Sequence, residues 1–285
     1  TTSQPANLPN ASVHLCVNAF LFLKMIAAIP PTALHLTFAN PLSLNTNLTR
    51  LFSTCIMFVA CSLAAGAADR SPADTTIKIA IASDSTAATW SAPHPERGWG
   101  QYLSENFDER VVIENFAKPG ASTRTFLDGG LWAQAIASHP NYVLIQFGHN
   151  DSHTPDHPEH TDAAGLYRQL LRRFVREARA TGATPILITP VARRTPEDTL
   201  VPYAEAMKAV ATETHTPLID LHRLSQRLYA RLGPGVQEEV GARKSDLSHF
   251  NEAGAKRIAR IVAEELSQAV PDLRKHDSNR NPIVR

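Results

Sequence analysis

The sequence predicts an α/β fold, a three-layer α/β/α sandwich around a mostly parallel five-stranded sheet. Two observations predict it. From Thr75 onward, apolar runs of strand length alternate with amphipathic stretches of helix length, the pattern of a parallel sheet covered by helices on both faces. In addition, segments rich in Gly, Ser, Asn and Asp follow several apolar runs, as expected for loops at the carboxyl edge of such a sheet.

The apolar runs predict strands at Ile77–Ala82, Val111–Asn115, Tyr142–Phe147, Pro185–Thr189 and Pro217–Asp220. Periodicity close to 3.6 residues predicts helices between and after them. These helices are expected at Gly100–Phe107, Leu131–His139, Asp162–Thr181, Tyr203–Thr214, Leu221–Leu232 and Glu252–Ala269. Residues 271–285 are polar with two prolines and predict a tail.

Composition limits the kind of protein this can be. The chain has 285 residues, 43% of them hydrophobic and 19% charged, with a formal net charge of +1. This is ordinary for a globular protein, and so small a net charge gives no general attraction to nucleic acid or an acidic membrane. We expect one domain over residues 68–285, with its core at 77–269.

The first part of the chain differs in character. Leu51–Ala67 is apolar, follows Arg50 and ends in Ala65-Gly66-Ala67, an A-x-A site. This is the layout of a secretory signal peptide, although a buried helix or a membrane anchor is an alternative. We expect residues 1–67 to lie outside the mature fold and the protein to be secreted or periplasmic. Lipid attachment at Cys61 is a further option, and cleavage after Ala67 would remove all three cysteines.

The first candidate for a reactive group is Ser85. It lies in the turn Ser83-Asp84-Ser85-Thr86, directly after the first predicted strand. A serine at the carboxyl end of a parallel strand is where an open α/β sheet exposes a nucleophile. A helix cap explains an isolated serine there equally well, so the assignment depends on partners elsewhere in the chain.

Later loops supply the partners that acyl transfer needs. In Asp246-Leu-Ser-His249, the histidine can take the proton of Ser85 while Asp246 holds the imidazole. Gly120 offers a backbone N–H and Asn150 a neutral side-chain donor, which with the Ser85 N–H would form an oxyanion hole. Each feature alone has an ordinary explanation as a cap or a turn. Together, and in this order at the ends of predicted elements, they predict a serine esterase.

These segments resemble the four sequence blocks of the SGNH, or GDSL, hydrolase superfamily. The blocks are Ser83–Thr86, Asn115–Ser122, Gly148–Asp151 and Asp246–His249. Within the superfamily, the sequence is most similar to rhamnogalacturonan acetylesterases. That likeness is carried by Ser85-Thr86-Ala87, Gly98-Trp99-Gly100-Gln101, Ser122-x-Arg124-Thr125-Phe126 and Gln146–Asp151.

The resemblance implies a flavodoxin-like SGNH hydrolase fold, with a site that needs no cofactor. It implies Ser85 as nucleophile, His249 as base and Asp246 as the partner of the base. It also implies an oxyanion hole formed by Ser85, Gly120 and Asn150. One position departs from the pattern, because Ser83 stands where GDS-type turns have glycine, which leaves the geometry of the turn open.

Other residues of the same loops are candidates for substrate binding. Trp90 follows the nucleophile turn and can stack on a sugar ring, and His149 is expected near the substrate. Arg124 and Arg193-Arg194 can meet the carboxylates of an acidic polysaccharide, with ordinary surface charge as the alternative. Four histidines fall in the loop 149–160, but their spacing matches no zinc pattern. We therefore expect a solvated loop and no metal.

The sequence thus predicts a serine esterase that hydrolyses O-acetyl esters on a plant cell-wall polysaccharide. The resemblance implies rhamnogalacturonan, a pectin, as the substrate. The expected partner is an acetylated polysaccharide or oligosaccharide, with no nucleic acid and no membrane span in the mature protein. The alternatives are a lipid or thioester hydrolase of the same superfamily and an inactive carbohydrate-binding relative.

Overall fold

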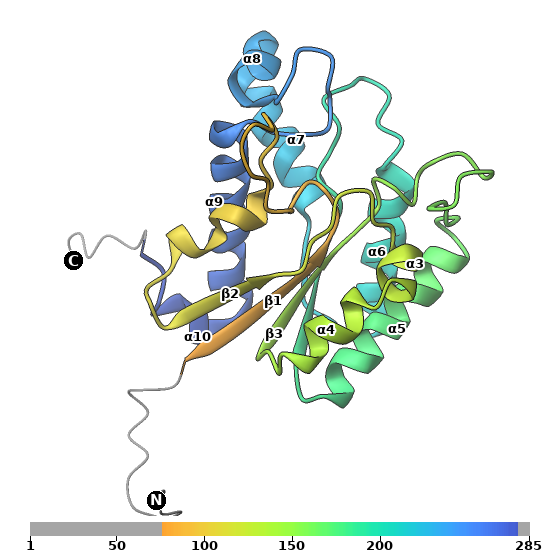
Figure 1. Ribbon diagram of the computed structural model, residues 1–285, viewed down its shortest axis with the longest axis vertical. Coiled ribbons are helices and arrows are strands. Elements are labelled where there is room, and N and C mark those ends of the chain that lie inside the picture. Colours follow the sequence, from red (N-terminus) through yellow and green to blue (C-terminus); the bar gives the residue numbers. More distant parts are fainter. Residues whose placement is uncertain (1–75, 279–285) are drawn as a thin grey trace, which may run out of the picture. The chain divides into compact units, whose positions relative to one another are not determined.

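The computed structural model describes residues 76–278 and contains a five-stranded, all-parallel sheet (Figure 1). The strand order is β2-β1-β3-β4-β5. The strands are β1 (Ile77–Ser83), β2 (Val111–Asn115), β3 (Tyr142–Gln146), β4 (Thr184–Ile188) and β5 (Leu218–Ile219). The predicted fold class is confirmed, and each strand falls where its apolar run predicts it, to within a residue or two.

The strand order creates a switch point between β1 and β3. The chain moves from β1 outward to β2 on one side and then returns to place β3 on the other side. Ser83 pairs with Gln146 in this central register, so the two strands end side by side. In open α/β sheets, ligands bind outside the carboxyl ends of the strands at such a point. The loop after β1 therefore begins where a binding crevice is expected.

Helices cover both faces of the sheet. In chain order they are η2 (Trp99–Asn106), α3 (Thr123–Asp128), α4 (Leu131–Ala137), α5 (Leu166–Ala180), α6 (Val201–Glu213), α7 (Leu221–Leu232), η3 (Gly233–Gly235), α8 (Val236–Val240), α9 (Glu252–Ala269) and α10 (Pro271–Arg274). Both α7 and α9 coincide with their predicted ranges. The stretch predicted at Gly100–Phe107 is a 3₁₀-helix, and the short helices α3, α8 and α10 are not predicted by the periodicity.

The alternation of β1 explains the two layers of core. Ile79 and Ile81 enter one apolar cluster together with residues of η2 and α9, such as Ile258. Ala80 and Ala82 enter the other cluster, which includes Phe174 of α5. Successive side chains of a strand point to opposite faces, so β1 is buried on both sides. Figure 1 shows η2 and α9 on one side of the sheet and α3–α6 on the other.

The prediction of a tail from residue 271 is wrong for residues 271–278. Leu273 in α10 is fully buried. His276 Nδ1 lies 2.8 Å from Asp108 Oδ2, and the Asp108 N–H donates to the His276 carbonyl at 2.9 Å. Proline fits the first turn of a helix, where its missing N–H costs nothing, so Pro271 begins α10 rather than a tail. These contacts join His276, just after α10, to the segment before β2.

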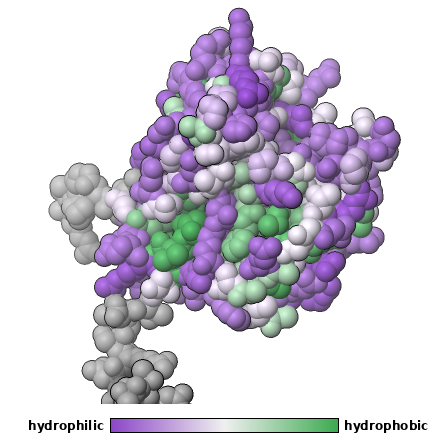
Figure 2. Space-filling view, viewed as in Figure 1, coloured by the Kyte–Doolittle hydropathy of each residue, from purple (hydrophilic) through white to green (hydrophobic). Residues whose placement is uncertain are grey.

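The predicted signal peptide, the option of lipid at Cys61 and the extension 1–67 lie outside the described residues. Within 76–278, none of the helices combines the length and the apolar character that crossing a membrane requires. The face shown in Figure 2 is mostly hydrophilic, with apolar residues gathered in limited patches. Within the same residues, the exposed large apolar side chains are Val112, Val201 and Leu247.

Candidate active site

Ser85 lies in a tight turn that continues β1, which we call the Ser85 turn (residues 83–86). Asp84 Oδ1 accepts hydrogen bonds from the Thr86 N–H at 2.9 Å and from Thr86 Oγ1 at 2.7 Å. Such Asx-type bonds fix a turn locally. Ser83 and Asp84 are fully buried and Ser85 is 8% exposed. The serine hydroxyl is therefore presented on a backbone with little freedom to move.

Buried side chains tie the Ser85 turn to the neighbouring strand. Gln146, the last residue of β3, donates from Nε2 to Thr86 Oγ1 at 3.0 Å and accepts from Trp99 Nε1 at 2.8 Å. Trp99 is fully buried and packs in the core. Its neighbour Gly98 allows this approach, because a Cβ there would lie 2.2 Å from the Ala88 carbonyl oxygen. The Gly-Trp-Gly segment thus holds Gln146, which in turn holds Thr86 of the Ser85 turn.

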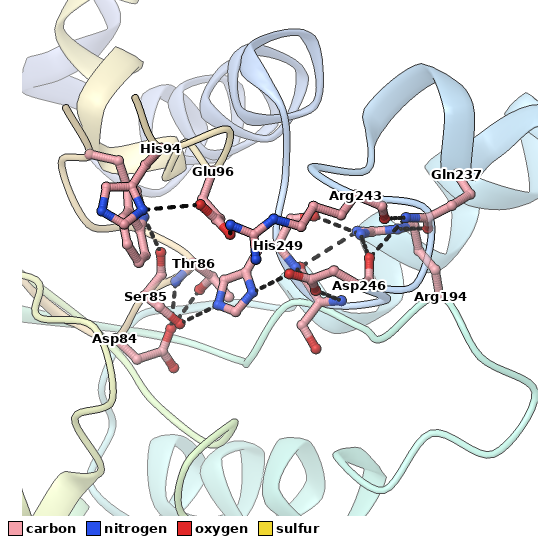
Figure 3. Close-up of polar contacts among 12 residues, drawn as sticks. Asp84, Ser85, Thr86, His94, Glu96, Arg194, Gln237, Arg243, Asp246 and His249 are labelled. Carbon is pink, nitrogen blue, oxygen red and sulfur yellow. Dashed lines mark hydrogen bonds and ion pairs between the residues drawn. The ribbon is translucent and has the colours of Figure 1, made fainter. Parts of the chain in front are cut away.

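Three predicted residues come together at the turn. His249 Nε2 lies 2.8 Å from Ser85 Oγ, and His249 Nδ1 lies 2.8 Å from Asp246 Oδ2. Figure 3 shows the three side chains in a row, with the histidine in the middle. Asp246 and His249 belong to the segment between α8 and α9, which we call the His249 loop (residues 242–249). The geometry is that of a nucleophile, a base and a group that orients the base.

Asp246 is held in its ionised form. Burial raises the pKa of this carboxyl, but the hydrogen bonds from the N–H groups of His249 and Ser248, both 2.9 Å long, and the His249 ring outweigh burial. The pKa of Asp246 is consequently lowered from its ordinary value. An ionised carboxylate at Nδ1 keeps the proton of a neutral imidazole on that nitrogen, which leaves Nε2 free to accept the Ser85 proton.

The predicted oxyanion donors lie on loops that reach the same edge. The Lys118 N–H donates to the Ser83 carbonyl at 3.0 Å, which joins the loop of Gly120 to the Ser85 turn. Gly120 has φ +79°, a backbone conformation that favours glycine. Asn150 Nδ2 donates one of its two N–H groups to the Ala121 carbonyl at 2.8 Å. This bond orients the amide, and the second N–H is not used in it. Their role as donors to an oxyanion stays a prediction.

Asp151 fastens two of these loops together. It is fully buried and accepts from Thr161 Oγ1 at 2.6 Å and from the Thr123 N–H at 3.1 Å. Burial raises the pKa of Asp151 to about 6, even though the bonds from the two threonines favour the charged form. Thr123 begins α3, so the carboxyl joins the start of this helix to the segment that carries Asn150. Sequence reasoning places Asp151 in a motif but does not identify this role.

The three candidates for substrate binding occupy different environments. Trp90 is half-buried, donates from Nε1 to the Ser85 carbonyl at 3.1 Å and meets the His249 ring edge-on at 6.2 Å. His149 is 5% exposed and its Nε2 lies 2.9 Å from the Val191 carbonyl. Arg124 donates to the Pro158 carbonyl. Trp90 thus lies beside the reactive pair, and for all three residues contact with substrate stays a prediction.

Two arginines outside the sequence blocks hold the His249 loop. Arg194 reaches the loop from outside it, and Arg243 belongs to the loop and reaches Glu96. Arg194 donates to carbonyl oxygens of the loop, and Arg243 of the loop pairs with Glu96 at 2.7 Å (Figure 3). The sequence suggests a sugar carboxylate as the partner of Arg194, and the structure gives it backbone partners instead. No motif in the sequence could have assigned these partners, because the contacts span 52 and 55 residues for Arg194.

The histidine-rich loop holds its side chains in local pairs. The rings of His153 and His157 stack at 4.2 Å, and His157 Nδ1 contacts a carboxylate oxygen of Glu159. His160 Nδ1 lies 2.6 Å from the His153 carbonyl. Across residues 76–278, we find no group of three or more His, Cys, Asp or Glu arranged to hold a metal ion.

Comparisons with known proteins show which sequences this chain is similar to. Residues 84–257 match the GDSL-like Lipase/Acylhydrolase family. The rhamnogalacturonan acetylesterase RhgT of Bacillus subtilis is 37% identical over 223 residues, which cover 70% of this chain and 94% of RhgT. The probable rhamnogalacturonan acetylesterase YesY of the same organism is 32% identical, over 67% of this chain and 92% of YesY.

Solved structures show the same fold. The crystal structure of YxiM from Bacillus subtilis has a TM-score of 0.59 at 29% identity, over 68% of this chain and 57% of that chain. This chain therefore spans little more than half of YxiM. The acetylxylan esterase Axe2 from Geobacillus stearothermophilus has a TM-score of 0.52 at 22% identity, over 67% of this chain and 94% of that chain.

Proposed function

Because the chain belongs to the GDSL-like lipase/acylhydrolase family and is a carboxylic ester hydrolase, we propose that it removes O-acetyl groups from a plant cell-wall polysaccharide. The substrate in this proposal is rhamnogalacturonan. Support for the sugar comes from the rhamnogalacturonan acetylesterase RhgT and the probable rhamnogalacturonan acetylesterase YesY, which are matched over nearly their whole length. Export by the predicted signal peptide at Leu51–Ala67 is part of the same proposal and rests on the sequence.

The observation that carries the proposal is the continuous hydrogen-bonded row from Ser85 through His249 to Asp246. In the proposed reaction, Ser85 Oγ attacks the acetyl carbonyl carbon while its proton passes to His249 Nε2. Collapse of the tetrahedral intermediate returns that proton to the sugar hydroxyl that leaves, and the acetyl group stays on Ser85. Water then repeats the sequence, with the same histidine as base, and releases acetate.

Charge develops on the former carbonyl oxygen in both tetrahedral intermediates. We assign the backbone N–H groups of Ser85 and Gly120 and the side chain of Asn150 as its donors. Neutral donors suit this task because they stabilise the oxyanion without neutralising the nearby carboxylate of Asp246. The bond from Asn150 to the Ala121 carbonyl supports this assignment, since a donor that is already oriented needs no reorganisation during the reaction.

The test is acetate release from acetylated rhamnogalacturonan, from acetylated xylan and from p-nitrophenyl esters of increasing chain length. We expect turnover on the acetyl substrates and loss of roughly 10⁵- to 10⁶-fold in kcat for Ser85→Ala. The matched control is Ser104→Ala, which removes an exposed serine hydroxyl in η2. A Ser85→Ala enzyme that turns over like the wild type would contradict the mechanism.

The other outcomes separate the alternatives. Preference for long acyl chains would identify a lipid or thioester hydrolase. Within the described residues, Leu247 is the exposed large apolar side chain that lies in the His249 loop, which offers little apolar surface to a long chain. Binding of the polysaccharide without turnover of any ester would identify an inactive relative. Equal rates on rhamnogalacturonan and xylan would keep the acetylesterase and reject the specific sugar.

A further inference from the structure

Arg194 lies in the loop after β4, and its guanidinium is directed at the backbone of the His249 loop (Figure 3). Nη2 donates to the Asp246 carbonyl at 2.8 Å and to the His249 carbonyl at 2.7 Å, and Nη1 is 3.5 Å from the Ser248 carbonyl. The Arg194 N–H also donates to the Leu247 carbonyl at 2.9 Å. One residue therefore contacts the backbone at every position from Asp246 to His249.

Other side chains hold the guanidinium in place. Arg194 Nε donates to Gln237 Oε1 at 2.7 Å, and Gln237 Nε2 in turn donates to the Asp246 carbonyl at 2.8 Å. The rings of Phe250 and Tyr229 lie 5.0 and 5.9 Å from the guanidinium carbon. Arginine is suited to such a place, because its planar fork stacks on rings and offers several donors in fixed directions.

The His249 loop needs this support because it has no helix or strand of its own. The Ala242 N–H donates to the His249 carbonyl and so joins the two ends of the loop, and within the loop the Asp246 N–H donates to the Arg243 carbonyl. Each bond is 3.1 Å long. The direction of the imidazole depends on the backbone of residues 246–249. A displacement of about 1 Å in a reacting group can cost about 10²-fold in rate.

We propose that Arg194 is a positioning residue, which keeps His249 and Asp246 in line with Ser85 by clamping the carbonyls of their loop. The proposal rests on the function proposed above and extends it to a residue outside the sequence blocks. The proposal also means that Arg194 does not bind the substrate. Four of its five side-chain N–H groups are directed at protein acceptors, so a sugar carboxylate would have to displace them.

The experiment measures kcat and KM of Arg194→Ala and Arg194→Lys with p-nitrophenyl acetate, an uncharged substrate without a sugar. We expect kcat of Arg194→Ala to fall about 10²-fold, with KM changed by less than about threefold. Millimolar guanidinium should restore part of kcat in Arg194→Ala and leave the wild type unchanged. Arg194→Lys should fold and remain impaired, because an ammonium group cannot reproduce the fork.

Arg257→Ala is the matched control, since it removes an exposed arginine of α9 that pairs with Glu239. It should keep wild-type kcat and show no response to guanidinium. If Arg194→Ala does not fold, Arg194→Lys takes its place in the test, and the same result is expected: a lower kcat with KM nearly unchanged. Wild-type kcat on p-nitrophenyl acetate in a folded Arg194 variant would overturn the proposal. When the same variants are also assayed on acetylated rhamnogalacturonan, a rise in KM confined to this acidic polysaccharide would overturn it too. Activity that survives Ser85→Ala would instead reject the proposed function and leave the clamp untouched.

Discussion

The Ser85 turn and the His249 loop meet at one hydrogen bond, yet they are held in different ways. In the Ser85 turn, Ser83 and Asp84 are fully buried, and Gln146 and Trp99 tie the turn to the sheet. In the His249 loop, Asp246 and His249 keep 19% and 29% of their side-chain surface exposed. Its supports are side chains that reach across from other elements, Arg194 and Gln237.

This difference indicates that the Ser85 turn is the more rigid half of the site. A turn that continues a buried strand shares the stability of the sheet, since opening it exposes core. A loop held by side chains can be displaced without unfolding the domain. We therefore expect substitutions near the Ser85 turn to affect stability and activity together, whereas substitutions around the His249 loop should affect activity more selectively.

Among the substitutions that test this comparison, the largest effect is expected from Asp246→Asn, which disrupts the site on the side of the His249 loop. Asparagine can still accept the N–H bonds of Ser248 and His249, so the fold should persist, but it favours the wrong tautomer of the imidazole. We expect kcat to fall about 10⁴-fold with little change in melting temperature. A joint loss of kcat and melting temperature would show that the loop is as closely coupled to the core as the turn is.

A smaller effect is expected on the side of the Ser85 turn. Asn150→Ala removes one assigned oxyanion donor and should lower kcat about 10²- to 10³-fold, measured on p-nitrophenyl acetate. It should also cost stability, because the Ala121 carbonyl loses its partner. The matched control is Asn141→Ala, which changes the residue just before β3, at the opposite edge of the sheet. Equal activity in the two variants would remove Asn150 from the site.

The smallest effect is expected for His149, a buried histidine that interacts electrostatically with Asp84 of the Ser85 turn and with His249. Burial lowers its pKa to about 4, with the positive charge of Arg193 and the nearby His249 acting in the same direction and Asp84 and the Val191 carbonyl acting against them. In the unfolded chain, a histidine titrates near 6.5. Between these values the unfolded state binds the proton and the folded state does not, so stability must fall as pH falls.

The measurement compares the free energy of unfolding of the wild type and His149→Gln between pH 7 and 4. The wild type should lose about 2–3 kcal/mol relative to the variant across this range, at about 1.4 kcal/mol for each pKa unit. Asp151 has the opposite sign, because its raised pKa of about 6 favours the folded state at lower pH. Its contribution is present in both proteins and cancels in the difference. Parallel pH curves would contradict a buried, neutral His149.

Much of the fold could be predicted from local sequence. The apolar run at β1 and the periodicity of α7 and α9 are strong because each element is buried along a whole face or stripe. The periodicity does not reveal α10, because only four residues form it and its buried Leu273 packs in a core made by distant elements. Short elements carry too few residues for a period to be seen.

The site divides in the same manner. Ser85, Asp246 and His249 could be proposed from the chain because each lies in a short motif at the end of a predicted element. The same holds for Gly120 and Asn150, whose role as oxyanion donors stays a prediction. The sequence could not place Ser85 against His249, since 164 residues separate them and the strand order brings them together. Nor could it assign Arg194, because an arginine in a loop is compatible with solvent, substrate or backbone. Its partners depend on how α7, α8 and the His249 loop pack around it, which is a property of long-range contacts and not of local pattern.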